Sequence, residues 1–121
     1  MTKQHFGTSH VPLSPAVRAG DFVFISGQVP VVEGRIVEGG VGAQTTKVLE
    51  NIAAALALAG CELSDVVKTT VWLKRAEDFA EFNAAYAPFF PKDPPARSTA
   101  ESRLMIDILV EIEAVAYKPL G

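Results

Sequence analysis

The chain has 121 residues, of which 49% are hydrophobic and 21% charged, and its formal net charge at pH 7 is −3. This length predicts one domain over residues 1–121, and the composition excludes an intrinsically disordered chain. The acidic balance and the lack of a lysine and arginine run argue against a broad nucleic-acid or membrane surface, but they are compatible with a local positive pocket.

Hydrophobic periodicity divides the chain into strands and helices after an irregular start over residues 1–20. In chain order we expect a buried strand, a hairpin, a helix, a strand, a second helix and two antiparallel strands, at residues 22–26, 31–37, 43–59, 66–74, 77–90, 98–103 and 108–117. The first strand is rich in aromatic and β-branched residues, and Glu33-Gly34 suits the turn of the hairpin.

Both predicted helices carry one apolar stripe. In the first helix Val48, Ile52 and Leu56 recur at helical spacing, and Gly60 suits the position that follows the last turn. The stripe of the second helix is aromatic and consists of Phe79, Phe82, Tyr86, Phe89 and Phe90. Pro88 is expected to shorten this helix. Each apolar stripe must be buried against a sheet.

Alternation along the strands predicts one apolar and one mixed face for that sheet. The apolar face is expected to carry Val67, Thr69, Val71 and Leu73 of one strand and Ile108, Val110, Ile112, Ala114 and Ala116 of the last strand. Two helices cover one face of a sheet of this size, which gives an α+β fold of two layers. Because Trp72 lies on the uncovered face, we interpret that face as a subunit interface.

The single cysteine, Cys61, has no partner for an internal disulfide, which fits a reducing compartment, and we expect it to be a packed structural thiol. No Cys/His cluster has the spacing of metal ligands, so we expect no metal site. The start of the chain lacks the apolar segment of a signal peptide, and no apolar run is long enough to span a membrane. We therefore expect a cytoplasmic protein.

The most informative segment is Pro94-Pro95-Ala96-Arg97, because two prolines stiffen the chain directly before an arginine. A guanidinium group binds a carboxylate through two parallel hydrogen bonds and stays charged at any working pH. The segment therefore suggests a site for a small anionic substrate. The alternative is a structural salt bridge from Arg97 to a glutamate of the last strand.

Three further positions are candidates for the same site. Glu111 is suited to orient a water or move a proton, although it also fits a solvated strand face. Ser26-Gly27 lies at a strand end, where glycine lets a ligand approach the backbone, or where the chain simply turns. Asn83 lies within the aromatic stripe, and its amide needs a partner in a neighbouring loop or in the pocket.

At these residues the sequence resembles the RidA/YjgF family of enamine/imine deaminases, which is also labelled endoribonuclease L-PSP or translation inhibitor. Six blocks in order carry the resemblance over nearly the whole chain, at residues 12–17, 25–30, 66–73, 82–90, 95–98 and 110–114. The resemblance implies one RidA-like domain with a chorismate-mutase-like α+β fold, and a mixed sheet with two helices on one face. It also implies a homotrimer with the sheets inside and three sites in clefts between subunits.

The resemblance implies a hydrolase of the 2-iminobutanoate/2-iminopropanoate deaminase type. Such enzymes convert reactive 2-enamino or 2-imino acids, such as 2-aminoacrylate, to 2-keto acids and ammonia without a cofactor. One alternative is a non-catalytic trimer that binds small carboxylates, and another is a pathway-specific deaminase of a larger amino-dienoic acid. RNA cleavage is disfavoured by the acidic charge.

Roles carry over residue by residue. Arg97 matches the arginine that binds the substrate carboxylate, and Glu111 matches the glutamate that assists water attack or proton transfer. Ser26 and Asn83 match polar residues near the pocket, and Gly27 matches a backbone contact.

Two positions depart from the family pattern. Thr99 replaces a cysteine, but its backbone groups can serve as they do in the family. Leu13 replaces a tyrosine and makes the wall of the cleft more apolar, which we expect to favour imines with apolar side chains.

Overall fold

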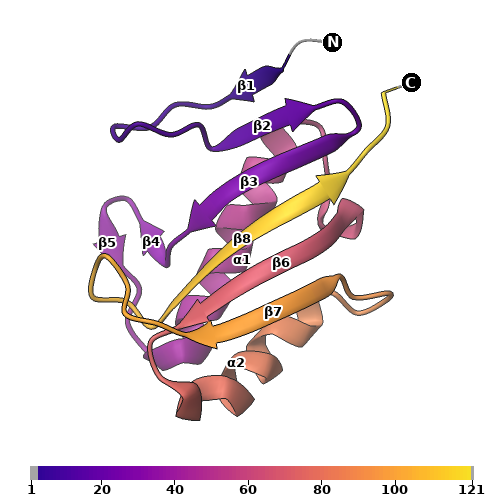
Figure 1. Cartoon of the computed structure of the whole chain (residues 1–121). Coiled ribbons are helices and arrows are strands. Elements are labelled where there is room, and N and C mark those ends of the chain that lie inside the picture. The colour runs from indigo at the N-terminus through magenta and orange to yellow at the C-terminus, as the bar shows by residue number, and fades with distance from the viewer. Residues whose placement is uncertain (1–2, 121) are drawn as a thin grey trace.

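The computed structural model describes residues 3–120, which form a six-stranded sheet, a separate small hairpin and two helices (Figure 1). The elements are β1 (Gln4–Phe6), β2 (Ala16–Ala19), β3 (Phe22–Gln28), β4 (Val31–Val32), β5 (Arg35–Ile36), α1 (Gly40–Leu58), β6 (Val66–Leu73), α2 (Phe79–Tyr86), β7 (Ala96–Glu101) and β8 (Val110–Tyr117). The strand order of the sheet is β1-β2-β3-β8-β6-β7, and only the β6–β7 pair is parallel.

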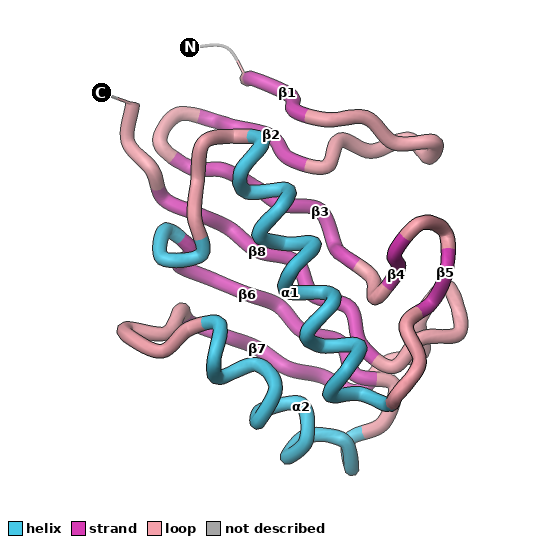
Figure 2. The backbone as a smooth tube through the Cα atoms, turned by 180° about the vertical axis from the view of Figure 1, so that it is seen from behind, coloured by secondary structure: helices cyan, strands magenta, loops and turns pink. Residues whose placement is uncertain are grey.

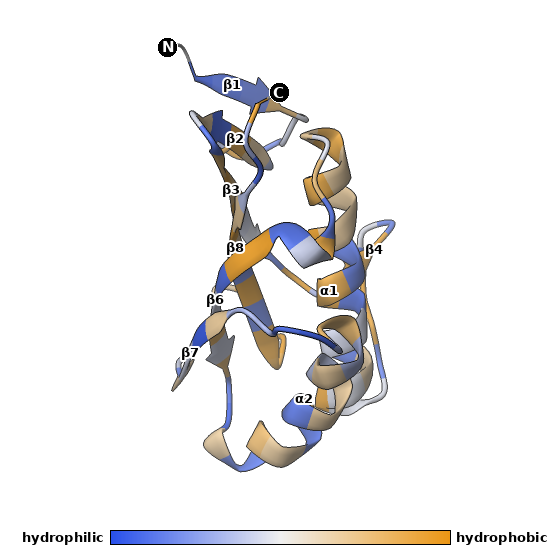
Figure 3. Ribbon diagram, turned by 90° about the vertical axis from the view of Figure 1, so that its right-hand side faces the viewer, coloured by the Kyte–Doolittle hydropathy of each residue, from blue (hydrophilic) through white to orange (hydrophobic). Residues whose placement is uncertain are grey.

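The sheet and the helices form two layers. Both helices lie on the same face of the sheet (Figure 2), and within residues 3–120 no element covers the opposite face (Figure 3). This confirms the expected α+β fold with a mixed sheet and two helices on one face. We call the uncovered side the open face of the sheet. No helix within residues 3–120 is long and apolar enough to cross a membrane.

The core lies between α1 and the centre of the sheet. Val48, Ile52 and Leu56 of α1 are fully buried, as their spacing predicts. The predicted apolar side of β8 is buried along its whole length, because alternate residues of a strand share one face. Gly60 ends α1 with a φ of +75°, and the N–H of Cys61 donates to the carbonyl of Leu56 over 2.9 Å, as in a helix-terminating turn.

The hairpin turns where it was predicted. Glu33 and Gly34 both have positive φ values, 50° and 77°, which are the values that a two-residue turn between antiparallel strands requires.

Residues 1 and 2 of the start that was expected to be irregular lie outside the described residues, and for residues 3–20 the expectation was wrong, because they contain two short strands. β2 pairs with β3, and β1 extends the sheet beyond β2. The hydrophobic pattern does not predict β2, because the buried positions of this strand are Ala16 and Arg18. An arginine thus occupies a position where an alternating strand normally has an apolar residue.

A β-bulge corrects the predicted face of one residue. The register of β6 against β8 shifts between Val66 and Lys68, so Val67 is an extra residue in the strand. Val66 is therefore buried and Val67 is 43% exposed, the reverse of the predicted alternation.

The second helix is shorter than predicted. It runs from Phe79 to Tyr86, and single 3₁₀ turns at 76–78 and 87–89 flank it. Pro88 lies in the second of these turns, where it has no helical hydrogen bond to break. β7 begins at Ala96, directly after the double proline and two residues before the predicted start.

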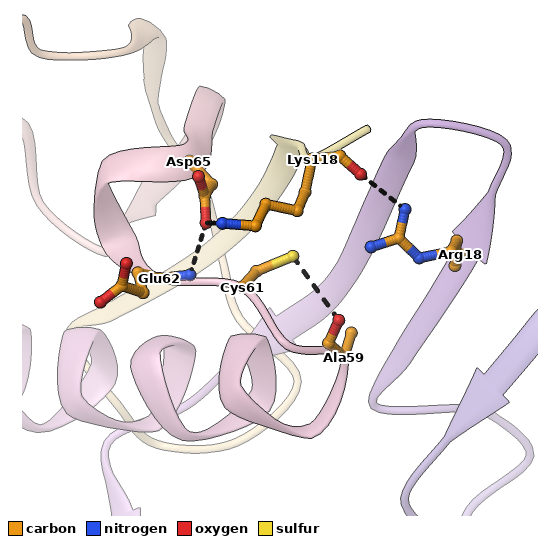
Figure 4. A network of polar contacts seen from close by, with 6 residues as sticks. All are labelled: Arg18, Ala59, Cys61, Glu62, Asp65 and Lys118. Carbon is orange, nitrogen blue, oxygen red and sulfur yellow. Dashed lines mark hydrogen bonds and ion pairs between the residues drawn. The ribbon is translucent and has the colours of Figure 1, made fainter. Parts of the chain in front are cut away.

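A network of polar contacts binds Lys118, which follows β8, at one corner of the sheet (Figure 4). The buried Arg18 donates hydrogen bonds from Nη1 to the carbonyls of Gly20 and Lys118, over 3.1 and 2.8 Å. Lys118 also forms an ion pair with Asp65 at 3.7 Å. Cys61 is buried beside this network, and burial raises the pKa of its thiol. The network contains none of the predicted site residues, and Cys61 is the packed thiol that the sequence predicts.

Because α1 packs against the sheet with one side only, substitution of two of its leucines is expected to change the free energy of unfolding by different amounts. Leu56 is fully buried and Leu58 is 51% exposed. Leu56→Ala leaves a cavity and is expected to lower the free energy of unfolding by about 2–5 kcal/mol, whereas Leu58→Ala changes it by about 0.5 kcal/mol or less. Urea unfolding at one fixed protein concentration measures both variants, and equal losses would contradict the packing described.

Candidate functional site

The double proline leads directly into the edge strand that carries Arg97. β7 pairs only with β6, and Arg97 lies opposite Thr69 in their parallel register. Thr69 is buried on the side of the helices. Arg97 shares that side, so its side chain points toward α2 and away from the open face.

Three aromatic side chains of α2 hold the guanidinium group of Arg97. The Cζ atom of Arg97 lies 5.6, 5.3 and 4.9 Å from the ring centroids of Phe79, Phe82 and Tyr86. Each cation–π contact of this kind contributes about 0.5–2 kcal/mol. The Tyr86 hydroxyl is in turn hydrogen-bonded to the Thr69 hydroxyl at 2.8 Å, which fixes its ring. We call these three rings the aromatic cradle.

The cradle holds Arg97 without neutralising it. Within residues 3–120 no ion pair and no side-chain hydrogen bond involves Arg97. The salt bridge considered as the alternative role of Arg97 is therefore wrong for the single chain. The N–H donors of the guanidinium group are free to bind an anion from outside the chain.

A cavity of about 340 Å³ lies beside this guanidinium. We call it the arginine pocket, and its lining residues are Asn83, Tyr86, Ala87, Phe90, Pro94, Pro95 and Arg97. The predicted residues Arg97 and Asn83 thus come together in one cavity. The two prolines have a second role besides stiffening the chain, because they form part of its wall.

Glu111 lies on the other side of the sheet. It is paired with Trp72 of β6, and Trp72 is paired with Ala100 of β7, so all three residues share the open face. Its carboxylate lies against the backbone of Gly27, where the Cβ of any other residue would meet it. This contact brings the predicted residues Glu111 and Gly27 together and explains the glycine by close approach.

The strand end beside Glu111 is fixed by short hydrogen bonds. The register of β3 against β8 shifts between Ile25 and Gln28, which marks a bulge at Ser26-Gly27. The Ser26 hydroxyl donates to the carbonyl of Ser14 over 2.6 Å, and the Ser26 N–H donates to the carbonyl of Pro15 over 3.0 Å. We call Ser26, Gly27 and Glu111 the glutamate cluster.

The environment of Glu111 makes its carboxyl group a weaker acid than that of an exposed glutamate. Burial raises the pKa of this carboxyl group, and the nearby negative charge of Glu113 raises it further. Within residues 3–120 Glu111 has no ion pair that would counter these effects. A carboxyl group with a raised pKa is a stronger base in its ionised form than an exposed glutamate, which suits it to accept a proton from water.

The two remaining predicted residues, Leu13 and Thr99, belong neither to the arginine pocket nor to the glutamate cluster. Leu13 is 49% exposed in the loop before β2, next to the residue that accepts the hydrogen bond from Ser26. Thr99 follows Arg97 by two positions on the side of the helices, and its hydroxyl is enclosed without a partner within residues 3–120. Thr99 is not among the residues that line the arginine pocket.

The predicted site residues therefore lie in two separate places in the single chain. The arginine pocket opens on the side of the helices, and the glutamate cluster lies on the open face, so the sheet separates Arg97 from Glu111. Sequence reasoning missed the aromatic cradle. The sequence predicts an aromatic stripe, and Phe82 and Tyr86 are buried in the core as expected, whereas Phe79 is 44% exposed. The contact of these rings with Arg97 has no local signal, because the arginine lies on a different element.

Comparison with known proteins gives consistent matches over most of the chain. The family model described as Endoribonuclease L-PSP matches residues 4–118. A RutC family protein of Pyrococcus horikoshii is 52% identical over 110 residues, which are 88% of this chain and 87% of that protein. A protein of Salmonella typhimurium named 2-iminobutanoate/2-iminopropanoate deaminase is 42% identical over 113 residues, 88% of each chain.

The fold has close structural matches as well. The crystal structure of the YjgF gene product of Escherichia coli superposes with a TM-score of 0.89 at 37% identity, over 94% of this chain and 98% of that chain. At 37% identity the two proteins share much of their sequence as well as their fold.

Proposed function

The chain belongs to the RidA/YjgF family, and from this membership and the free Arg97 we propose that it is an enamine/imine deaminase. Its substrates are 2-enamino and 2-imino acids, and its products are 2-keto acids and ammonia. The observation that carries the proposal is an arginine held by three aromatic rings at the edge of a cavity, with no anionic partner within residues 3–120. The Salmonella relative, named as a deaminase of this type, supports it.

The complete site is built from two copies of the chain. Arg97 and Glu111 point to opposite sides of one sheet, so the glutamate that serves an arginine comes from a neighbouring copy. Arg97 lies on the edge strand, where a second copy can approach. A contact between two different surfaces forms a ring when its rotation closes, and we propose the ring of three that the family resemblance implies. The partly apolar open face then becomes an interface.

The proposed reaction follows from these positions. Arg97 binds the substrate carboxylate through two hydrogen bonds, which fixes the imine carbon. Glu111 of the neighbouring copy accepts a proton from a water, whose oxygen forms a bond to the imine carbon C2. Glu111 returns that proton to the nitrogen, which gives a carbinolamine with a hydroxyl and an amino group on C2. The hydroxyl proton then passes to the amino group, again by way of Glu111, the C–N bond breaks with its electron pair on nitrogen, and ammonia leaves as the C2 carbonyl forms. Because imines already hydrolyse in water, positioning and proton transfer through one carboxylate supply the acceleration required.

Removal of the arginine tests this function directly. Arg97→Ala deletes two charge-assisted hydrogen bonds to the carboxylate and is expected to lower kcat/KM by about 100-fold or more. The exposed Arg35, in the hairpin, offers a matched control, and Arg35→Ala is expected to retain wild-type activity. Imines are generated from amino acids by an amino-acid oxidase, and their loss is followed by semicarbazide trapping. Full activity of Arg97→Ala would overturn the assignment.

The pKa of Glu111 predicts an acid limb in the pH profile. The carboxylate is the form that accepts a proton, so activity is complete above the pKa and falls as the pH decreases through it. Because burial raises this pKa, the fall begins at a higher pH than for an ordinary glutamate. Rates corrected for uncatalysed hydrolysis measure the limb. Glu111→Gln is expected to lose both the limb and most of the activity, and an active variant with an unchanged limb would exclude this role.

A further inference from the structure

The arginine pocket has almost no polar wall apart from Arg97 itself. Four of its lining residues are apolar, namely Ala87, Phe90, Pro94 and Pro95. The hydroxyl of Tyr86 is already engaged by Thr69. This leaves the amide of Asn83 as the one other polar side chain of the lining with free hydrogen-bonding groups. A cavity of about 340 Å³ with this lining is larger and more apolar than binding of a carboxylate alone requires.

The geometry points to a specificity pocket: the cavity beside Arg97 takes the side chain of the substrate and selects 2-imino acids with branched or aromatic apolar side chains. The inference rests on the proposed function and specifies the substrate class. In a 2-imino acid the side chain leaves the carbon that also carries the carboxylate. A carboxylate bound to Arg97 therefore places the first side-chain carbons next to the guanidinium, where the apolar wall begins.

The same wall disfavours small or polar side chains. A methyl group leaves most of the cavity without contacts, and a hydroxyl group finds few partners after it loses its water. One additional methylene in an apolar pocket changes kcat/KM by about 10-fold or more. We therefore expect the imine derived from leucine to be hydrolysed with a kcat/KM at least about 10-fold above that of the imine derived from alanine.

Ala87 is the position at which the pocket can be filled with least disturbance. It lies in the 3₁₀ turn after α2, lines the cavity and is exposed in the single chain, so a leucine enters the free volume without displacing the core. Ala84 lies one helical turn earlier, is exposed and does not line the cavity. The same substitution at Ala84 is therefore the matched control.

Binding of the stable 2-keto acid products gives a measurement that does not depend on turnover. We expect 4-methyl-2-oxopentanoate to bind at least about 10-fold more tightly than pyruvate in titration calorimetry. Ala87→Leu is expected to reduce this ratio to about threefold or less, whereas Ala84→Leu keeps it. Arg97→Ala is expected to weaken binding of both acids, because both carry the carboxylate. The imine assay with leucine and alanine as parent amino acids gives the corresponding ratio of kcat/KM.

The outcomes separate this inference from the proposed function. Tighter binding of the larger keto acid that is lost in Ala87→Leu supports the pocket, even if no imine is hydrolysed and the deaminase proposal fails. Imine hydrolysis with equal or better use of the alanine imine, or a ratio that Ala87→Leu leaves unchanged, contradicts the pocket and leaves the deaminase proposal intact. Equal binding of the two keto acids by the wild type also contradicts the pocket.

Discussion

The alternation of side chains along a strand is the constraint on which the organisation of this site depends. Successive residues of β7 and β8 point to opposite faces, and the register through β6 assigns Arg97 to the side of the helices and Glu111 to the open face. Within one chain the two side chains lie on different faces of the sheet and on strands separated by β6. This separation is the reason for the proposal that a site using both groups takes them from two copies.

The aromatic cradle explains how an arginine can stay available in such a site. A guanidinium group without a carboxylate partner is normally solvated or pairs with whichever acid lies nearest. Here the rings of α2 supply favourable contacts with the faces of the cation and leave its N–H groups free. The acidic residues of β8 are kept away by the sheet itself. The helix layer thus serves both as the cover of the core and as the support of the Arg97 guanidinium.

Much of this structure could be predicted from the sequence, and each failure has a physical cause. Helix α1, the buried side of β8 and the turn at Glu33-Gly34 follow from periodicity and turn chemistry alone. β2 was missed because a buried arginine interrupts its pattern, and Val67 was misplaced because a bulge has no local signal.

For the candidate site, the double proline singles out Arg97 in the sequence, and the structure places Arg97 beside both prolines in one cavity. The separation of Arg97 from Glu111 could not be predicted, because it depends on β6 lying between the two strands. Strand order and register are set by contacts between distant segments, so a local pattern does not reveal them. The contact of the exposed Phe79 with Arg97 could not be predicted for the same reason, because Arg97 lies 18 residues further along the chain.

The central claim, that each site takes its arginine from one copy and its glutamate from another, is tested most directly by mixing two inactive variants. Arg97→Ala and Glu111→Gln are refolded together in equal amounts, with the mass of the assembly checked by light scattering. In a closed ring with random mixing, about one site in four receives an intact arginine and an intact glutamate, so about a quarter of wild-type activity is expected to return. If the mixture assembles and remains as inactive as the separate variants, the two residues act within one copy and the account is wrong.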